Sequence, residues 1–370
     1  MSKNDLEIIQ GSGKLHFEKR TRIAKIRSPL ANFEVVEQKI EYRKDPLLDH
    51  WSRINALRAE RVKQATNPGE NYETNLKELI AKSAEKCFFC PQNVQKSTPK
   101  FPEEINLGER IIRNNFALFP NLFVFSENHA VGVLGEKHFT PLNEISPEIW
   151  KEAIMGSIEY FKALYKTNKE IVYPSINFNF LPPSASSIIH PHIQIIQDVQ
   201  PTEMTEKLLK KSREYFENSK QKNNFWIDLI ETEKKLKSRL VSDNDFMTWV
   251  ATYSPIGKNE LTGICKIPKT DITQFNEQEA TALANEICKA LNALYQGRGV
   301  RSVNMALYIG PIEEDVSEYF RINIRIVSRP TLEPNYTGDI GFMELLHTET
   351  IAEASPEIIA ETVREYFKLK

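Results

Sequence analysis

The alternation of apolar and polar residues follows the same order twice, first from about residue 111 to 198 and again from about 246 to 329. Each stretch begins with two runs typical of strands, continues with one long amphipathic helix and ends with two further strands. The expected strands are residues 114–125, 130–138, 173–181 and 190–198 in the first copy, and 246–253, 261–269, 302–310 and 319–327 in the second. The alternation is clearest at Ile322, Ile324 and Ile326, which predicts one buried face.

The helices carry their own N-terminal signals. Ser146 followed by Pro147 supplies an N-cap and a proline suited to the first helical turn. Asn276, with Glu279 three residues later, resembles a capping box. Residues 201–237 are charged with a helical period and would connect the two copies, and Ser355 would cap a final helix.

This duplicated order predicts an α+β fold in which two tandem repeats form pseudo-symmetric antiparallel sheets with flanking helices. The expected units are an N-terminal extension, a first domain, a helical connector and a second domain, at residues 1–40, 41–200, 201–245 and 246–370. The last strand of the first copy is rich in histidine, whereas the second copy has Asn323 and Arg325 there. We therefore expect the first copy to be catalytic and the second to be structural.

Composition narrows the class of protein. The 370 residues are 41% hydrophobic and 26% charged, which is typical of a globular protein. No apolar run approaches the roughly 20 residues of a membrane-spanning helix, and the first residues lack a signal-peptide core, so we expect a cytoplasmic protein without membrane contact. A net charge of −2 argues against nucleic acid as a partner. The basic residues between positions 14 and 27 favour a solvated arm over a phosphate-binding one.

The segment from His190 to Gln194 reads His-Pro-His-Ile-Gln and carries the strongest chemical signal. In a strand, His190, His192 and Gln194 share one face, and Pro191 places the segment at a strand start or a sheet edge. Two histidines on an accessible face can form a metal pair, or divide into a ligand and a nucleophile. Histidines that are merely satisfied within the core or at the surface are the plain alternative.

Cys87 and Cys90 form a C-x-x-C pair, which tetrahedral zinc accepts. A redox pair is the competing interpretation, but the helical run before Cys87 does not fit a βαβ setting. His138 and His190 are the leading candidates to complete a site with two cysteines and two histidines. Arg58 and Arg61 would share a helical face and could clamp phosphates, although a solvated charged face is the more frequent explanation.

The order of these pieces is more specific than any one of them. Asp45-Pro46-Leu47 and Trp51 precede the two arginines, the Cys-Phe-Phe-Cys pair, a strand pair ending in histidine and the His-Pro-His-Ile-Gln run. This set resembles the galactose-1-phosphate uridylyltransferase family, a nucleotidyltransferase branch of the histidine-triad superfamily, over roughly residues 41–366. The resemblance implies histidine-triad-like repeats, a role in carbohydrate metabolism and a homodimer.

Carried over residue by residue, the resemblance also implies a site. His192 matches the nucleophile that takes the nucleoside monophosphate, and Gln194 matches the side chain that hydrogen-bonds its phosphoryl oxygens. The implied substrate-binding residues are Arg58, Arg61, Asn114, Asn115, Asn179 and Ser187. The implied ligands of a structural zinc ion are Cys87, Cys90, His138 and His190, and His129 receives no role.

The implied reaction moves a nucleoside monophosphate between a nucleotide sugar, such as UDP-glucose, and a sugar 1-phosphate through a covalent His192 intermediate. A related phosphorylase, comparable to ADP-glucose phosphorylase and using inorganic phosphate, is the alternative. A third hypothesis is a non-catalytic, zinc-stabilised nucleotide-binding module.

The sequence also departs from the family. Tyr308, Asn323 and Arg325 stand where many members bind a second metal, so we expect that site to be absent. The family's hexose-contacting glutamine has no clear counterpart around residues 347–350, which leaves galactose specificity open and motivates the phosphorylase alternative.

Overall fold

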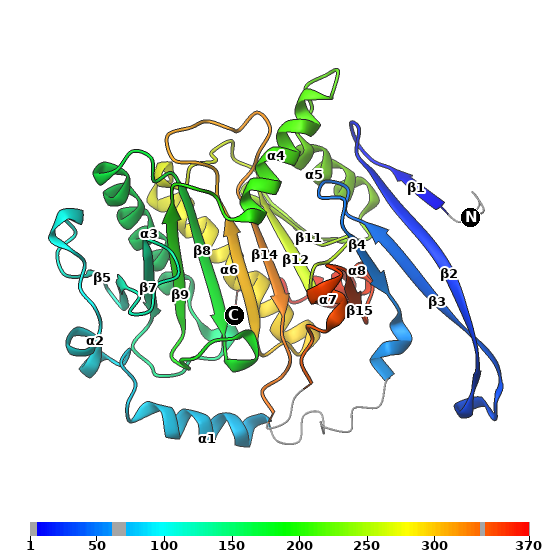
Figure 1. Ribbon diagram of the computed structural model, residues 1–370, viewed down its shortest axis with the longest axis horizontal. Coiled ribbons are helices and arrows are strands. Elements are labelled where there is room, and N and C mark those ends of the chain that lie inside the picture. Colours follow the sequence, from blue (N-terminus) through cyan, green and yellow to red (C-terminus); the bar gives the residue numbers. More distant parts are fainter. Residues whose placement is uncertain (1–5, 61–71, 334–336, 370) are drawn as a thin grey trace.

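The computed structural model describes residues 6–60, 72–333 and 337–369 (Figure 1). The strands in these ranges are β1 Leu6–Gln10, β2 His16–Ser28, β3 Glu34–Lys44, β4 Trp51–Ile54, β5 Ile111–Arg113, β6 Phe116–Pro120, β7 His129–Leu134, β8 Tyr173–Phe180, β9 His192–Asp198, β10 Leu240–Asp243, β11 Met247–Ala251, β12 Lys258–Cys265, β13 Val303–Tyr308, β14 Asn323–Ser328 and β15 Thr350–Ala352. The α-helices are α1 Tyr72–Ala84, α2 Pro91–Ser97, α3 Pro147–Thr167, α4 Glu203–Glu217, α5 Phe225–Leu236, α6 Glu277–Arg298, α7 Phe342–Leu346 and α8 Pro356–Arg364. None of these helices is long and apolar enough to cross a bilayer.

Both repeats contribute to one sheet. Its strand order is β10-β11-β12-β14-β13-β8-β9-β7-β6-β5, so the second repeat occupies one half and the first repeat the other. The halves meet where β13 pairs antiparallel with β8, with Met305 opposite Phe178. Each half repeats the same order outward from this seam, which confirms the α+β class and the pseudo-symmetry of the repeats. The repeat sheets are joined edge to edge, because each exposes a strand that the other can pair.

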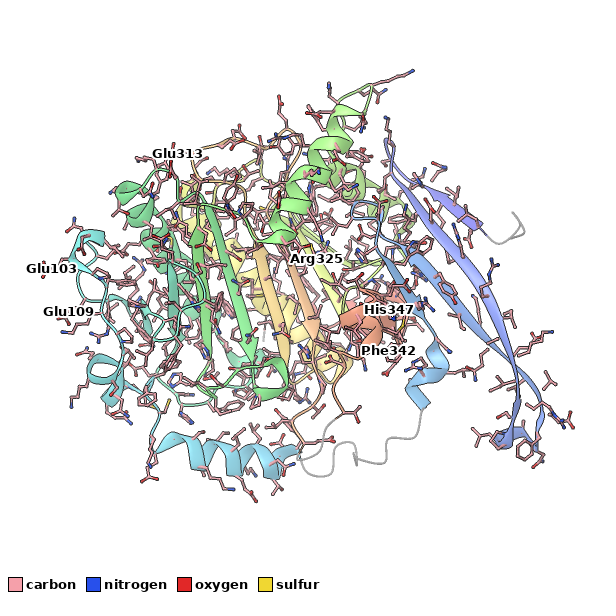
Figure 2. All side chains as sticks on the ribbon, viewed as in Figure 1. Glu103, Glu109, Glu313, Arg325, Phe342 and His347 are labelled. Carbon is pink, nitrogen blue, oxygen red and sulfur yellow. The ribbon has the colours of Figure 1, made fainter. Side chains whose placement is uncertain are left out.

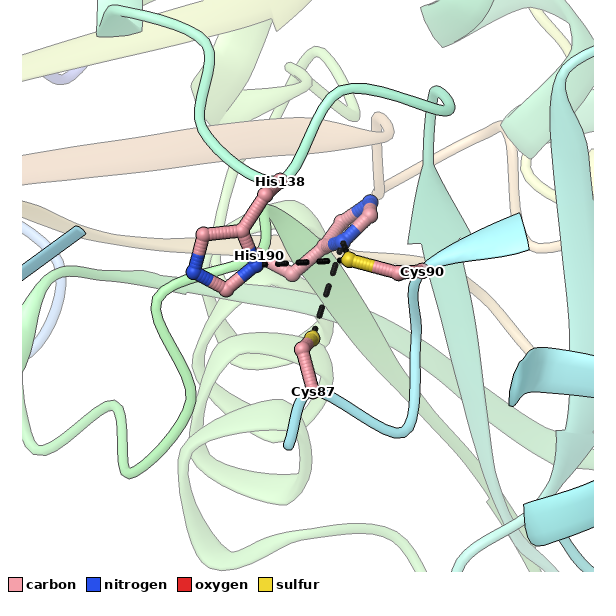
Figure 3. A group of neighbouring side chains, drawn as sticks. All are labelled: Cys87, Cys90, His138 and His190. Carbon is pink, nitrogen blue, oxygen red and sulfur yellow. Dashed lines mark hydrogen bonds between the residues drawn. The ribbon is translucent and has the colours of Figure 1, made fainter. Parts of the chain in front are cut away.

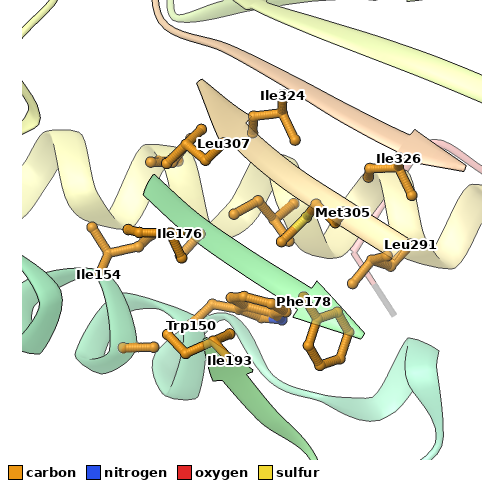
Figure 4. Close-up of a cluster of buried hydrophobic side chains, with 14 of the residues drawn as sticks. Trp150, Ile154, Ile176, Phe178, Ile193, Leu291, Met305, Leu307, Ile324 and Ile326 are labelled. Carbon is orange, nitrogen blue, oxygen red and sulfur yellow. The ribbon is translucent and has the colours of Figure 1, made fainter. Parts of the chain in front are cut away.

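Alternation along the strands decides which face is covered. Ile176, Phe178 and Ile193 point to one side together with Met305 and Ile324 in the neighbouring half, and all five are buried. Helices α3 and α6 lie against this side, and Figure 4 shows Trp150 of α3 and Leu291 of α6 among the packed side chains. Ser146 caps α3, and Asn276 with Glu279 forms the capping box of α6, as the sequence predicts. The opposite face of the first repeat is left for polar side chains.

Three sequence expectations need correction. The run 114–125 is not one strand: Asn114 and Asn115 form the turn between β5 and β6, and residues 122–125 follow β6 as an exposed, non-strand segment. Asn114 has a φ of 44°, a left-handed conformation that asparagine tolerates well. The strand expected from His190 begins only at His192, because Pro191 cannot donate to the ladder. β9 is an interior strand between β7 and β8, so Pro191 marks a strand start, and the alternative of a sheet edge is wrong.

The N-terminal segment forms a second sheet of order β1-β2-β3-β4-β15, in which only the β4–β15 pairing is parallel. Figure 1 shows the long β2–β3 ribbon extending along one side of the molecule. Several of its basic side chains form ion pairs within the sheet: Lys19 with Glu7 at 2.7 Å and Lys25 with Glu37 at 2.8 Å. This pairing favours the solvated arm. The helices α4 and α5 lie within the predicted connector, residues 201–245, and pack beside this sheet, and Ser355 caps α8 as expected.

A network of ion pairs joins the N-terminal sheet to the rest of the chain. The buried Arg43 guanidinium on β3 donates to both carboxylate oxygens of Glu357 on α8, at 2.9 and 2.8 Å. Arg239 donates to Glu357 at 3.3 Å and to the buried Glu233 at 2.7 Å. Burial alone would raise the pKa of Glu357, but Arg43, aided by Arg239, holds it down at about 2. Glu357 is therefore the carboxylate that holds the two cations together.

This depressed pKa predicts an acid-dependent loss of stability. The Glu357 contribution is fully present above the unfolded pKa of about 4.3 and disappears as pH falls toward the folded value. Urea midpoints measured at pH about 6 and about 3 should therefore lie closer together in Glu357→Gln than in the wild type. Glu37→Gln removes one partner of an exposed pair and should leave the difference unchanged. An unaltered difference in Glu357→Gln would refute this account.

Candidate active site

Four side chains from distant parts of the chain form one cluster (Figure 3). Cys87 and Cys90 lie before and at the N-cap of α2, His138 lies in the loop after β7, and His190 directly precedes Pro191. Their ligand atoms all lie within 4.8 Å of one another, and three of the four residues are buried. Nδ1 of His190 is 3.8 Å from each sulfur, and Nδ1 of His138 is 3.5 Å from Sγ of Cys90. The structure thus brings together all four metal ligands that the resemblance implies.

Hydrogen bonds behind the cluster orient both histidine rings. Ser83 Oγ donates to the Leu79 carbonyl at 2.6 Å and so accepts from Nε2 of His138 at 2.8 Å. Nε2 of His190 donates to the Gly135 carbonyl at 2.8 Å. Each ring therefore turns an unprotonated Nδ1 toward the sulfurs, the arrangement found around histidine ligands of metals.

The donor set fits a metal ion on chemical grounds. Burial lowers the pKa of His190 to about 4, which keeps its imidazole neutral and able to coordinate. Burial, followed by the neighbouring Cys87, raises the pKa of Cys90 to about 11, so a nearby cation is what would favour the thiolate. Two sulfurs and two imidazole nitrogens form a closed tetrahedral set, suited to a structural role. The cluster could hold a metal ion, and its four protein ligands would leave no coordination position open for a substrate.

His192 begins β9, next to the cluster, and is also buried. Its Nδ1 donates to the backbone carbonyl of His190 at 2.8 Å, so the neutral ring carries its lone pair on Nε2. Burial lowers the pKa of His192, which favours this neutral form. The Phe89 ring packs against the imidazole in an edge-to-face arrangement, with the ring centroids 5.2 Å apart. His190 therefore has two roles: its ring belongs to the metal cluster, and its carbonyl sets the tautomer of His192.

Gln194 lies two residues along β9 on the same face as His192. Asn177 of β8 is directly opposite Gln194, and its side chain donates to the Gln194 carbonyl at 3.4 Å. Gln194 Oε1 is 3.1 Å from Nε2 of His129, whose pKa is lowered by burial. The same Nε2 is 3.1 Å from Nδ2 of Asn121, whose Oδ1 accepts from the Phe123 amide, so His129 lies between two amide side chains. His129, to which sequence reasoning gave no role, thus contacts a candidate catalytic residue.

The remaining residues from the first repeat lie around this face. Asn179 follows Asn177 by two residues on β8, so alternation places it on the face of His192 and Gln194. Ser187 is exposed in the loop between β8 and β9, three residues before His190. Asn114 and Asn115 are exposed at the β5–β6 turn, where the Asn115 carbonyl accepts from the Gly135 amide at 2.9 Å. Gly135 therefore connects this turn to the metal cluster.

The arginine pair can be described only in part. Arg58 lies in a short 3-10 helix, Ala56–Glu60, and lines a cavity of about 140 Å³ together with Lys258 and Asp339. Nε of Arg58 is buried, and it makes no hydrogen bond within the described ranges. Arg61 lies outside the described residues. The structure thus places Arg58 next to the second repeat, beyond the seam from His192.

The second repeat carries different chemistry at the equivalent positions. In β14, Arg325 pairs with Ala306 of β13, which in turn pairs with Asn177 of β8. Arg325 is buried near the middle of the molecule (Figure 2), and its Nη1 is 3.5 Å from Oε1 of Glu260. Burial raises the pKa of Glu260, and Arg325 opposes that rise. An arginine and a glutamate thus occupy the region that corresponds to the histidines of the first repeat.

Fold and site together define an α+β protein of two tandem repeats, of which the first carries a Cys₂His₂ cluster and a buried histidine on a sheet face with polar side chains. No family model matches the chain. A protein of Archaeoglobus fulgidus described only as uncharacterized is 29% identical over 352 residues, covering 95% of this chain and 98% of that protein. Galactose-1-phosphate uridylyltransferase of Kluyveromyces lactis is 24% identical over 278 residues, which cover 66% of this chain and 70% of the enzyme.

Solved structures agree with this class. ADP-glucose phosphorylase from Arabidopsis thaliana, solved with bound ADP-glucose, superposes with a TM-score of 0.68 and covers 88% of this chain and 99% of its own. Its sequence is 17% identical, so the similarity shows the fold. These matches agree with the resemblance to the galactose-1-phosphate uridylyltransferase family: the chain has the fold of galactose-1-phosphate uridylyltransferase-like proteins.

Sequence reasoning missed the residues that support the site. Ser83, Gly135 and His129 act through hydrogen bonds to the residues that it named. Asn304 and Arg329 approach the first repeat from the second. The only available signal was the polar Asn304 in an otherwise apolar central strand, since the pairing of β13 with β8 is invisible in the sequence.

Proposed function

We propose that the protein transfers a nucleoside monophosphate from a nucleotide sugar to a sugar 1-phosphate through a covalent intermediate on Nε2 of His192. The observation that carries this proposal is the hydrogen bond from His192 Nδ1 to the His190 carbonyl at 2.8 Å. That bond keeps the Nε2 lone pair free on a face that also bears the amides of Gln194 and Asn179. Such amides suit the charge that spreads over phosphoryl oxygens in the transition state.

The chemistry divides one displacement into two. In the first step the Nε2–phosphorus bond forms, the bond from the α-phosphorus to the bridging oxygen breaks, and the sugar 1-phosphate leaves. In the second step a phosphate oxygen of the acceptor attacks the same phosphorus, and the bond to Nε2 breaks. One histidine thereby serves both directions, which gives ping-pong kinetics.

We also propose that the metal is zinc, since two sulfurs and two imidazoles in a closed set are its usual structural ligands. Bound there, zinc would fix the cysteine pair and His190. The His190 carbonyl would then hold His192, so the ion would act on the reaction only through the position of the imidazole.

A phosphorylase is the second candidate, with inorganic phosphate as acceptor. The segment around residues 347–350 supports this candidate, because it has no glutamine to contact a hexose. Its Glu349 is instead paired with Arg53 at 2.6 Å. The structural similarity to a phosphorylase with bound ADP-glucose supports the same alternative.

The test is intact-mass measurement after separate incubation with UDP-glucose, UDP-galactose, ADP-glucose, GDP-mannose and diadenosine tetraphosphate. We expect one donor to add the mass of one nucleoside monophosphate in an acid-labile bond, and the size of the increase names the base. Adding glucose 1-phosphate or inorganic phosphate to the isolated adduct then identifies the acceptor that removes it. No adduct with any of these donors would favour the nucleotide-binding module instead.

A further inference from the structure

A chain of hydrogen bonds crosses the seam between the repeats and ends at Asn179. Asp339 accepts from Nε and Nη2 of Arg329 at 3.1 and 2.8 Å. Nη1 of Arg329 donates to Oδ1 of Asn304 at 2.8 Å. Nδ2 of Asn304 then donates to Oδ1 of Asn179 at 2.6 Å and to the Ser184 carbonyl at 2.9 Å. We call these four residues, Asp339, Arg329, Asn304 and Asn179, the amide chain.

The direction of each bond is fixed by the chemistry of the groups at both ends. An arginine can only donate, so the atom of Asn304 that faces Arg329 must be its oxygen. The Ser184 carbonyl can only accept, so the opposite atom of Asn304 must be its nitrogen. Asn179 therefore has to turn its oxygen toward Asn304, which leaves its NH₂ group on the other side. An amide whose two ends are ordinarily hard to tell apart has one orientation here.

The position of Ser184 reinforces this constraint. It lies in the turn after β8, where Leu181 and Ala185 have φ angles of 69° and 67°, in the left-handed region that side chains disfavour. Ser184 is buried, and its Oγ donates to the Leu181 carbonyl at 2.7 Å. The turn thus holds its carbonyl toward Asn304 in a conformation that only surrounding contacts can maintain.

The orientation matters because Asn179 lies on the face of His192. Its Nδ2 makes no hydrogen bond to any other described residue, so both of its N–H groups are available on that face. Arg329 and Asp339 are mostly buried, with side chains 18% and 7% exposed, so their pair is shielded from water. A fixed donor costs no reorganisation when negative charge develops on a bound phosphoryl group.

We propose that Asn304 and Arg329, both from the second repeat, are positioning residues that hold Asn179 as a hydrogen-bond donor to the phosphoryl group at His192. This inference rests on the proposed function for the identity of that group. The inference gives the second repeat a role in the site, although this repeat carries no nucleophile of its own.

Asn304→Asp tests the orientation without changing the size of the side chain. The aspartate can still accept from Arg329, but it can no longer donate, so Asn179 should rotate and turn its oxygen toward the phosphoryl group. We expect binding of inorganic phosphate and of AMP, measured by calorimetry, to weaken about 10-fold. Formation of the nucleotidyl adduct should slow roughly 100-fold, as expected when one donor is lost from a developing charge.

The matched control is Asn259→Asp. Asn259 also accepts from an arginine, Arg298, at 3.0 Å and donates to Ser328 at 2.9 Å, but it has no contact with Asn179. The Asn259→Asp substitution introduces the same charge as Asn304→Asp, and it should leave phosphate binding unchanged.

A double-mutant cycle separates positioning from general damage to the fold. If Asn304 acts through Asn179, Asn179→Ala combined with Asn304→Asp should bind phosphate no more weakly than Asn179→Ala alone. Additive effects, or normal binding by Asn304→Asp, would overturn the inference, as would a wild-type protein that binds neither phosphate nor AMP. If the wild type binds phosphate but forms no adduct, the proposed function fails while the cycle still decides the role of Asn304.

Discussion

Replacement of His192 by glycine is expected to abolish the nucleotidyl adduct and to reduce turnover on the order of 10⁴-fold or more, the usual effect of removing a covalent nucleophile. The buried imidazole lies on the face of Gln194 and Asn179, and because its Nδ1 donates to the His190 carbonyl, its Nε2 is free to attack. Burial lowers the pKa of His192, so the imidazole is already neutral near pH 7 and needs no separate base to remove a proton. Intact mass and steady-state rates with the accepted donor are the measurements.

His16→Gly is a suitable control for the His192 prediction. His16 lies at the start of β2 with a half-exposed side chain, far along the chain from the site. It should retain both the adduct and the rate. Nucleotide binding by His192→Gly should persist, because the amides and backbone groups remain. Undiminished turnover in His192→Gly would exclude covalent catalysis at this residue, whatever the protein binds.

Cys87→Ser is expected to remove one metal ion per chain and to lower the unfolding midpoint by roughly 10 °C, since loss of a structural metal belongs to the most destabilising single changes. The cluster joins the start of α2, the loop after β7 and the loop before β9. Without the ion these three segments lose their common fixed point. Elemental analysis and thermal unfolding on the same samples test both effects together.

Cys288→Ser separates the metal from the general cost of losing a thiol. Cys288 is buried in α6, and its thiol donates to the Ile145 carbonyl at 3.3 Å, a bond that serine can also make. Its metal content should equal that of the wild type. Absence of metal from the wild-type protein itself would disprove the assignment of the cluster, even if Cys87→Ser proved unstable. Activity of Cys87→Ser should fall further than its stability explains, because His190 would no longer hold His192.

Local patterns predicted the elements better than their boundaries. The caps of α3, α6 and α8 depend on a few adjacent residues, so Ser146, Asn276 and Ser355 identified them correctly. The run 114–125 failed because an apolar segment can be an exposed loop as well as a strand. Nothing in residues 122–125 distinguishes the two, since the difference lies in which neighbours pair with them.

The candidate site divides in the same way. The cysteine pair and the histidines follow from residue type and spacing, and together with the resemblance they gave all four ligands of the cluster. The partners that orient them come from pairings across long sequence separations. Asn304 contacts Asn179 across 125 positions, and no periodicity in a single sequence encodes that register. The prediction that one strand face carries His190, His192 and Gln194 was wrong for His190. This residue precedes β9, and its ring belongs to the cluster.

The seam between β8 and β13 has a consequence for how this molecule can change over generations. The second repeat has no histidine in β14, yet it cannot be dispensed with, since its strand β13 covers the hydrogen-bonding edge of β8 and carries Asn304. The second repeat can therefore carry different buried groups, Arg325 and Glu260, as long as its pairing with β8 is kept. Selection would keep the second repeat for this pairing, and we expect the first half, expressed alone, to expose the edge of β8 and not to remain a soluble monomer.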